Sequence, residues 1–267
     1  MNAHPSYPGR AIQVLTVFTL VLTTSCAGAA QGGGWTPSPT QPPAIPAATN
    51  PSVQAPAVVE TTAPAGTRAE TLRRGDTGAR VLALQRRLDA LGYWLGTPDG
   101  SFGLLTEQAV YALQGVAGLT RDGVVGTRTR AALDAGTRPV ARSHHGAVTE
   151  IDRDAGVISF VRGGVVELVL HTSTGTFEEY RHGGRQLLAD TPEGRFAVTW
   201  SHDGWREGAL GRLYRPRYFH PDGIAVHGYP SVPAFPASHG CARVTVAAMD
   251  MIWARGLMPA RGSVWVY

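Results

Sequence analysis

Apolar residues recur at helical spacing in the first strongly patterned part of the chain. Val81, Leu84, Leu88 and Leu91 follow one another at intervals of three and four residues, separated mainly by polar and small residues. This period places them on one face of an α-helix, and Gly92 is of the residue type that most often ends helices. The pattern predicts an amphipathic helix that stops at Gly92.

The same region contains an internal repeat with a period of 23 residues. The first copy holds Asp99, Gly100, Gly103, Thr106 and Ala109, and the second holds Asp122, Gly123, Gly126, Thr129 and Ala132. Each Asp-Gly turn supplies permissive backbone, and each threonine is placed to cap or begin the helix that follows. Residues 71–135 are therefore predicted to form a small all-α domain.

The pattern then changes to short apolar runs separated by turn residues. Residues 157–161 and 165–170 are apolar and are joined by the glycine pair 163–164, which predicts a β-hairpin. A second glycine pair at 183–184 marks another turn, and residues 247–255 form the one clear candidate helix. The span 147–267 is predicted to be a mainly-β domain, joined to the helical one by a linker over 136–146.

The first 26 residues predict an export signal. Arg10 precedes an apolar run over residues 11–22, which is too short to cross a bilayer core of roughly 30 Å as a helix. The small residues before Cys26 resemble a bacterial lipobox, in which the cysteine is lipidated. Ordinary signal cleavage after Ala29 or Ala30 is the alternative. Either interpretation predicts an exported protein, and a lipid on Cys26 would hold it in the cell envelope, at the outer face of the cytoplasmic membrane.

Residues 27–70 are rich in Pro, Ala, Thr, Gly and Gln and hold almost no charged or large apolar side chains. Such a composition cannot bury enough surface to fold, so this span is predicted to be a disordered tether.

Charge adds little to this picture. The formal net charge is +4, all 24 basic residues are arginines, and the span 147–267 holds 12 Arg against 12 Asp plus Glu. A balanced, dispersed charge argues against a nucleic-acid surface. No nucleic-acid partner is predicted, contact with a membrane is expected only through a lipid on Cys26, and the oligomeric state is left open.

Candidate chemistry centres on Cys241, the only cysteine outside the leader. Exported proteins usually pair their cysteines, so an unpaired thiol close to histidines predicts a nucleophile. His239 and His227 compete for the role of base. Closeness in sequence alone does not decide which of the two imidazoles lies against the thiol. His227 follows the apolar run 224–226, which is typical of a core strand.

These residues form a motif that resembles the active site of the L,D-transpeptidases. The motif is His227-Gly228 followed by Ser238-His239-Gly240-Cys241-Ala242-Arg243. The resemblance extends from about residue 147 to 267, includes two upstream loops at 173–175 and 191–194, and implies a mixed β-sandwich.

A second resemblance covers the helical part. Three motifs match the type 1 peptidoglycan-binding domain, namely Leu72-Gly75-Asp76-Gly78-Val81, Leu91-Gly92-Tyr93 and Asp99-Gly100-Phe102-Gly103-Thr106. The resemblance implies a three-helix domain that binds the cell wall, without indicating which residues touch glycan.

The transpeptidase resemblance implies roles for five residues. Cys241 is the nucleophile and His227 the general acid and base, with the backbone carbonyl of Gly228 orienting its imidazole. His239 has a supporting role, and the backbone amides of Gly240 and Cys241 donate to the oxyanion.

Three further residues are candidates for substrate binding: Tyr218, Ser238 and Arg243. Tyr218 aligns with a tyrosine that the family places over the active site, and a core or rim aromatic is the alternative. The Arg243 guanidinium suits a substrate carboxylate or, equally, a structural ion pair.

No cofactor or metal is expected. A zinc site would need His220, His227, His239 and Cys241 together, and no short ligand pair at metal spacing supports one.

The resulting hypothesis is an exported cysteine acyltransferase that forms peptidoglycan crosslinks by L,D-transpeptidation through a Cys241 thioester. Its partners are the stem peptides and glycan of the wall. An L,D-carboxypeptidase that uses the same residues, or a wall-binding protein without activity, are the alternatives.

Overall fold

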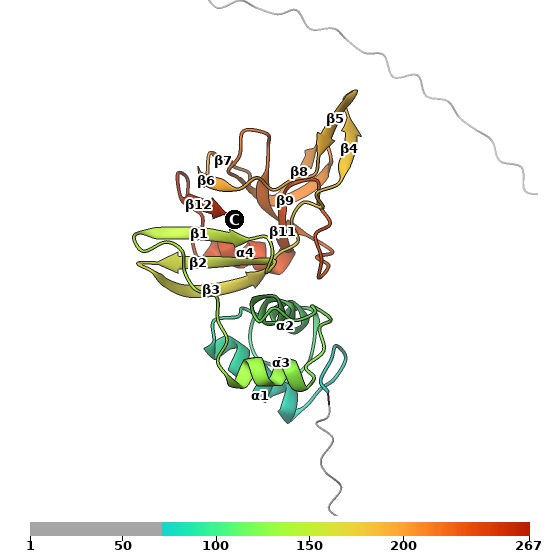
Figure 1. Ribbon diagram of the computed structural model, residues 1–267, viewed down its shortest axis with the longest axis vertical. Helices are drawn as coiled ribbons and strands as arrows, with labels where there is room; N and C mark the ends of the chain where they lie inside the picture. Colours follow the sequence, from blue (N-terminus) through green and yellow to red (C-terminus); the bar gives the residue numbers. More distant parts are fainter. Residues whose placement is uncertain (1–70) are drawn as a thin grey trace, which may run out of the picture. The chain divides into compact units, whose positions relative to one another are not determined.

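The computed structural model describes residues 71–267, and these fall within one compact unit (Figure 1). The predicted export signal, tether and lipidated Cys26 lie outside the described residues. No helix within 71–267 combines the length and the apolar character that crossing a membrane requires.

Three helices form the first part of the fold, as predicted: α1 (Ala79–Ala90), α2 (Leu104–Val116) and α3 (Thr127–Asp134). Val81, Leu84 and Leu88 are all buried on one face of α1. Gly92 has a φ of 84°, and its N–H donates to the carbonyl of Asp89, so this glycine ends the helix where the sequence predicts.

The repeat works through a buried glutamine that the sequence pattern did not reveal. The Gln85 amide group donates to the Asp99 carboxylate at 2.9 Å and to the Thr106 hydroxyl at 2.9 Å, while its carbonyl accepts from the Gly100 N–H at 2.7 Å. Thr106 lies inside the first turn of α2 rather than at its cap, because its hydroxyl faces this glutamine. One side chain therefore ties the Asp-Gly turn to two helices.

The second copy repeats this arrangement with Gln114 in the same role. Its side chain bonds Asp122, Gly123, Val124 and Thr129. Buried amide side chains are costly unless all their groups find partners, and here the turn backbone supplies them. The 23-residue period thus marks two copies of one turn and helix, each closed by a glutamine.

The second part of the fold contains two five-stranded sheets and a separate hairpin. The first sheet has the order β3-β2-β1-β12-β6. Its strands are β1 (Ala147–Asp152), β2 (Val157–Arg162), β3 (Val165–His171), β6 (Gly194–Ala197) and β12 (Ser263–Val266). Only the β1–β12 pair is parallel, and the predicted hairpin is β2–β3.

The second sheet has the order β11-β10-β9-β7, with β8 paired to β9. Its strands are β7 (Trp200–Ser201), β8 (Trp205–Gly208), β9 (Gly211–Tyr218), β10 (Ala225–Tyr229) and β11 (Ala242–Thr245). The β10–β11 pair is parallel. The glycine pair at 183–184 turns the separate hairpin of β4 (Glu179–His182) and β5 (Arg185–Leu188), as predicted.

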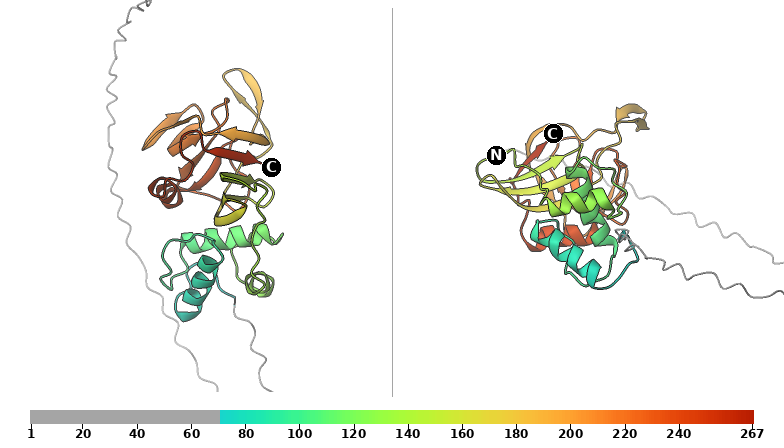
Figure 2. Two further views of the ribbon diagram at one scale, coloured as in Figure 1. Left: turned by 90° about the vertical axis from the view of Figure 1, so that its left-hand side faces the viewer. Right: turned by 60° about the horizontal axis from the view of Figure 1, so that its bottom comes forward.

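Helix α4 (Val246–Ala254) begins at Thr245, whose hydroxyl accepts from the Ala248 N–H at 3.1 Å. Its buried face packs on the second sheet. One core cluster joins Ile158 of the first sheet, Val244 of the second and Ile252 of α4. The two sheets and the helix therefore share a single core, which fits the mixed β-sandwich implied by the sequence (Figures 1 and 2).

A second core cluster crosses from the helices to the first sheet. It includes Leu88 and Leu113 of the helical part together with Val157 and Val169 of β2 and β3. The two folded parts pack together, a point that the sequence left open.

The connecting residues also bind the sheet. The backbone N–H groups of Arg142 and Ser143 donate to the carboxylate of Glu150 on β1, which is 1% exposed. The Tyr267 hydroxyl donates to the same carboxylate at 3.1 Å. Glu150 thus holds the connection from the helical part and the last strand in one place.

The contact between α2 and the β-domain is close enough to exclude a side chain at Gly115. A Cβ atom there would lie 1.9 Å from the carbonyl oxygen of Ala155. Glycine inside a helix is unfavourable by about 1 kcal/mol relative to alanine. The close approach of the two domains explains why glycine nevertheless stands at position 115.

We expect Gly115→Ala to destabilise the protein by about 2 kcal/mol, because the clash outweighs the gain of about 1 kcal/mol in helix propensity. Gly103→Ala is the control for a glycine without a close neighbour, since nothing lies within 4 Å of a Cβ there. Because Gly103 is the N-cap of α2, where glycine is preferred to alanine, we expect a cost of no more than about 1 kcal/mol. Urea unfolding of the three proteins measures the difference. A Gly115→Ala protein as stable as the original would show that α2 can move away at no cost.

Candidate functional site

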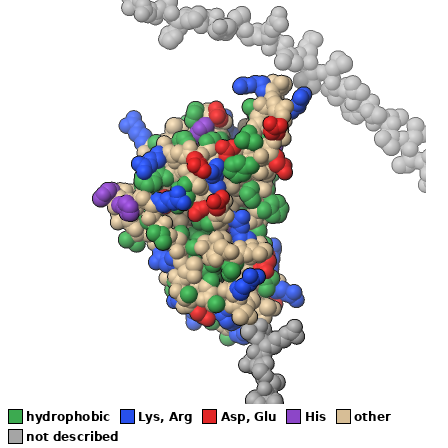
Figure 3. Space-filling view, viewed as in Figure 1, with side chains coloured by type: hydrophobic (Ala, Val, Ile, Leu, Met, Phe, Trp, Pro, Cys, Tyr) green, Lys and Arg blue, Asp and Glu red, His purple; other side chains and the backbone are tan. Residues whose placement is uncertain are grey.

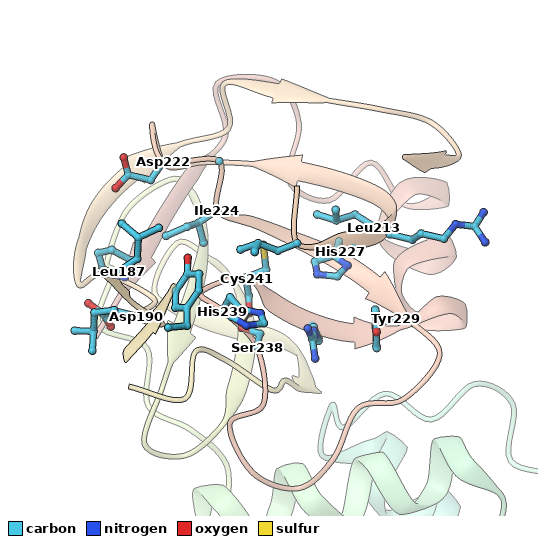
Figure 4. A pocket seen from close by; sticks show the side chains of 18 of the residues that line it. Leu187, Asp190, Leu213, Asp222, Ile224, His227, Tyr229, Ser238, His239 and Cys241 are labelled. Atoms are coloured by element: carbon cyan, nitrogen blue, oxygen red, sulfur yellow. Dashed lines mark hydrogen bonds between the residues drawn. The ribbon is translucent and has the colours of Figure 1, made fainter. Parts of the chain in front are cut away.

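Five of the residues singled out by the sequence meet at a cavity of about 570 Å³. The β4–β5 hairpin, the β8–β9 hairpin and the ends of β10 and β11 contribute to its lining. His227, Cys241, Ser238, His239 and Arg243 all line it. Figure 4 shows His227 and Cys241 next to each other on neighbouring segments, with Ser238 and His239 close to the thiol.

His227 lies in the middle of β10 and is 3% exposed. The register between β9 and β10 shifts between Val226 and Gly228, so β9 bulges opposite this histidine. Arg215, at the bulge, has a φ of 49°, which is uncommon for a residue other than glycine. Bulges redirect side chains near functional sites, and this one lies beside the candidate base.

The protonation state of His227 follows from its contacts. Its Nδ1 lies 3.0 Å from the carbonyl oxygen of Gly228. A carbonyl only accepts, so Nδ1 carries the proton and Nε2 keeps a free lone pair. Burial lowers the pKa of His227 to about 4; the Gly228 hydrogen bond opposes this change and the charge of Arg243 adds to it. The imidazole is therefore neutral at pH 7 and can take a proton.

Cys241 is a free, half-buried cysteine directly before β11. Burial raises the pKa of its thiol, while a backbone hydrogen bond from Ala225 and the charge of Arg243 lower it. The thiol is thus protonated at neutral pH. A protonated thiol next to a neutral imidazole is the arrangement in which the base acts when the nucleophile attacks.

Hydrogen bonds hold the turn that carries the thiol, which we call the catalytic turn (residues 238–241). The Ser238 hydroxyl donates to the carbonyl of Cys241 at 2.6 Å and accepts from the Gly240 N–H at 3.0 Å. The Thr191 hydroxyl donates to the Gly240 carbonyl at 2.7 Å and accepts from the Gly175 N–H at 3.0 Å. Both upstream loops noted in the sequence therefore support this turn.

Gly240 can only be glycine. Its φ is 138°, and a Cβ atom would lie 2.6 Å from the carbonyl oxygen of Asp190. The structure shows that the close neighbour is the protein's own backbone.

The predicted oxyanion donors differ in their availability. The Gly240 N–H is already engaged by Ser238. The Cys241 N–H donates to no acceptor within residues 71–267. Of the two amides, the one on Cys241 is therefore free to face a developing negative charge.

Ser238 serves the turn more than the cavity. A hydroxyl has one proton to donate, and Ser238 donates it to Cys241. It can offer a ligand only a lone pair, so its predicted role in substrate binding is limited to accepting a hydrogen bond.

Arg243 places a positive charge in the wall of the cavity. Its Nη1 donates to the Ala237 carbonyl at 2.9 Å, and its guanidinium lies 4.3 Å from the centre of the Tyr229 ring. No carboxylate in the described part of the chain forms an ion pair with it. The described residues therefore show no structural ion pair at Arg243, and its role in binding a ligand carboxylate stays a prediction.

The remaining two candidates are His239 and Tyr218. His239 is exposed, and its ring meets that of Tyr180 on β4 at 4.6 Å. Tyr218 stacks on Trp200 at 5.1 Å and is not among the residues that line the cavity. A role for Tyr218 in binding substrate stays a prediction.

Comparisons with known proteins agree with this geometry. The chain is 48% identical to an L,D-transpeptidase of Xylanimonas cellulosilytica whose crystal structure is known, over 74% of this chain and 98% of that one, with a TM-score of 0.72. The chain belongs to the L,D-transpeptidase family. Residues 147–264 match the L,D-transpeptidase catalytic domain, and residues 77–133 match the peptidoglycan-binding domain family.

Shorter similarities connect this chain to enzymes named as amidases. It is 40% identical over 89 residues to the N-acetylmuramoyl-L-alanine amidase CwlL of Bacillus licheniformis. It is also 43% identical over 56 residues to the amidase CwlM of Mycobacterium tuberculosis. The chain spans only 25% and 14% of the lengths of these two relatives. An L,D-transpeptidase catalytic domain joined to a peptidoglycan-binding domain is the composition of a cell-wall enzyme.

Some residues of the candidate site gave no signal in the sequence. Tyr180 and Leu187 reach the cavity from the β4–β5 hairpin, and Leu213 reaches it from β9. Only the fold brings these positions together. The sequence does mark Thr191, because it opens one of the two loops that resemble the family.

Charges of both signs surround the site. Arg185, Arg212 and Arg243 line the cavity together with Asp190 and Asp222. Basic and acidic side chains are also interspersed on the face seen in Figure 3. Within residues 71–267 no three side chains of His, Cys, Asp or Glu gather as metal ligands, so the four residues considered for zinc form no such group.

We expect the protein to lose stability on acidification from about pH 6.5 to about pH 4. The pKa of His227 is about 4 in the folded state, whereas that of an exposed histidine is near 6.5. Between these two pH values the unfolded chain binds more protons than the folded protein. The free energy of unfolding therefore decreases by up to about 1.4 kcal/mol for each unit by which the pH is lowered. His171, with its pKa also near 4, adds a second such contribution.

Urea unfolding between pH 4 and pH 7 measures this slope. His227→Gln should remove its share of the slope, and His144→Gln, an exposed residue of the connecting segment, should not. An unchanged slope in His227→Gln would mean that this imidazole titrates normally in the folded protein.

Proposed function

We propose that this protein forms peptidoglycan crosslinks by L,D-transpeptidation, with Cys241 as the acyl carrier. The observation that carries the proposal is the pairing of a protonated, half-buried thiol with a neutral, buried imidazole whose Nδ1–H is bound to Gly228. Arg243 faces the same cavity with an unneutralised charge. Membership of the L,D-transpeptidase family supplies the substrate class.

In the first half of the reaction, Nε2 of His227 takes the proton of the Cys241 thiol as Sγ attacks a carbonyl carbon. The carbonyl is that of the third stem residue, a diaminopimelate, in a tetrapeptide donor. The backbone N–H of Cys241 faces the oxyanion. The C–N bond to D-alanine then breaks, and His227 returns the proton to the leaving amine, which leaves a thioester on Cys241.

In the second half, an amine of a neighbouring stem attacks the thioester carbonyl. His227 takes a proton from this amine and gives it to the departing sulfur, so the free thiol is restored. The product is a 3-3 crosslink. Arg243 fits the task of holding a stem carboxylate, because its charge faces the cavity and a guanidinium can bind a carboxylate through two hydrogen bonds.

Mixing the protein with a disaccharide-tetrapeptide and analysing the products by mass spectrometry tests the reaction. We expect a crosslinked dimer that lacks one D-alanine, absent with Cys241→Ala and reduced at least about a hundredfold with His227→Gln, since general base catalysis contributes 10²–10⁴. His144→Gln, exposed and distant in sequence, serves as the matched control.

Other products would identify the alternatives. Tripeptide without dimer would mean that water resolves the thioester and that the protein is an L,D-carboxypeptidase. Unchanged substrate with a folded protein that binds peptidoglycan sacculi would mean a wall-binding protein without activity.

We further propose that the protein is exported and anchored through a lipid on Cys26. Its support is the apolar segment followed by small residues before this cysteine, together with domains that act on the cell wall. We expect the full chain to partition with membranes and Cys26→Ser to be released, as measured by fractionation and immunoblotting. Release of both proteins would leave export by ordinary signal cleavage.

A further inference from the structure

The chain between the two catalytic residues depends on hydrogen bonds from outside. We call residues 230–237 the proline loop, because three of its eight residues are prolines. Proline has no N–H to donate, so the loop can form few backbone hydrogen bonds of its own. Three of its carbonyls accept instead from side chains elsewhere: Val232 from Gln108 at 2.9 Å, Pro233 from His171 at 2.8 Å and Phe235 from Ser173 at 2.8 Å.

The first of these donors comes from the peptidoglycan-binding domain. Gln108 lies on α2 and is 6% exposed. Tyr111 and Gly115 follow it at helical spacing on the same face. The Tyr111 ring lies 5.3 Å from the ring of His171, and Gly115 is where α2 meets the backbone of Ala155. One face of α2 is therefore shaped to the catalytic domain and reaches the proline loop.

The second donor is fixed in its neutral form. Burial lowers the pKa of His171 to about 4, and the bond to Pro233 requires a proton on Nε2 because a carbonyl only accepts. Gln108 and His171 thus hold two successive carbonyls. Removing either donor would leave a buried carbonyl without a partner, which costs about 1–3 kcal/mol unless the loop moves.

Movement of the proline loop would reach the catalytic turn. The N–H groups of Ala237 and Ser238 both donate to the Thr174 carbonyl at 3.0 Å, and the Ala237 carbonyl accepts from Arg243. Ser238 in turn bonds the backbone of Cys241. Gln108 is therefore connected to the thiol through the backbone of the proline loop and then through two hydrogen bonds, from Arg243 to the Ala237 carbonyl and from Ser238 to the Cys241 carbonyl.

We propose that Gln108 of the peptidoglycan-binding domain is a positioning residue for acyl transfer at Cys241. It acts through the proline loop, with His171 as its partner in the catalytic domain. The expected effect of Gln108 on turnover rests on the proposed function. The expected effect of Gln108 on the reactivity of the Cys241 thiol rests on the geometry alone.

Gln108→Met tests the proposal in the full chain, because methionine keeps the shape and removes the donor. Glu107→Met is the matched control, since Glu107 is the neighbouring residue and its ion pair with Arg74 stays within the helical part. Three experiments compare the proteins: thermal unfolding for the melting temperature, steady-state kinetics with a disaccharide-tetrapeptide for kcat and KM, and alkylation of Cys241 by iodoacetamide as a function of pH.

We expect Gln108→Met to lower kcat/KM about fivefold, which corresponds to about 1 kcal/mol, the net value of one hydrogen bond. The apparent pKa of alkylation should rise, because Arg243, whose charge lowers the pKa of the thiol, is held less firmly. Glu107→Met should match the original protein in both. A folded Gln108→Met protein with unchanged kcat/KM and unchanged alkylation overturns the proposal.

A second pair of variants covers a failure of Gln108→Met to fold. His171→Gln keeps a donor for Pro233 and should retain activity, whereas His171→Leu removes it and should show the same two changes. If neither variant that lacks a donor folds, the donors serve the fold and not the site, and the proposal is wrong. If no protein forms crosslinks but the alkylation profiles still differ, the proposed reaction fails and the positioning of the thiol stands.

Discussion

Parallel pairing of β10 and β11 is the constraint on which the rest of the site depends. It brings His227 and the residue after Cys241 to neighbouring strands, but a parallel pair cannot be joined by a tight turn. The chain must leave the sheet and return, and the residues that do so include three prolines that cannot donate backbone hydrogen bonds. Hydroxyl, amide and imidazole side chains from four other segments supply the missing bonds.

Burial keeps His227 and Cys241 uncharged until the reaction begins. Burial moves the pKa of His227 down and that of Cys241 up, so both groups rest in their neutral forms. A permanently charged pair in the same place would carry a large desolvation cost. Arg243 remains charged at the cavity wall, where it opposes protonation of the imidazole and stabilises negative charge on sulfur.

Sequence reasoning predicted the elements well and their supports poorly. The 23-residue repeat and the glycine pairs predicted turns and helices, because these depend on local backbone preferences. The buried glutamines Gln85 and Gln114 close the repeat, yet a single polar residue on an apolar helix face produces no periodic signal.

The candidate site shows the same division. The motif indicated His227 and Cys241, whereas Ser238 and Gly240 were assigned to substrate and oxyanion. Their hydrogen bonds instead close the catalytic turn, through contacts with residues that are adjacent only in the folded chain. The core that joins the helices to the first sheet also opposes hinge movement between them. If the helical part binds a glycan strand, the distance between that strand and Cys241 would then be nearly constant. The place at which the protein binds the strand would therefore determine which stem peptides can contact the thiol.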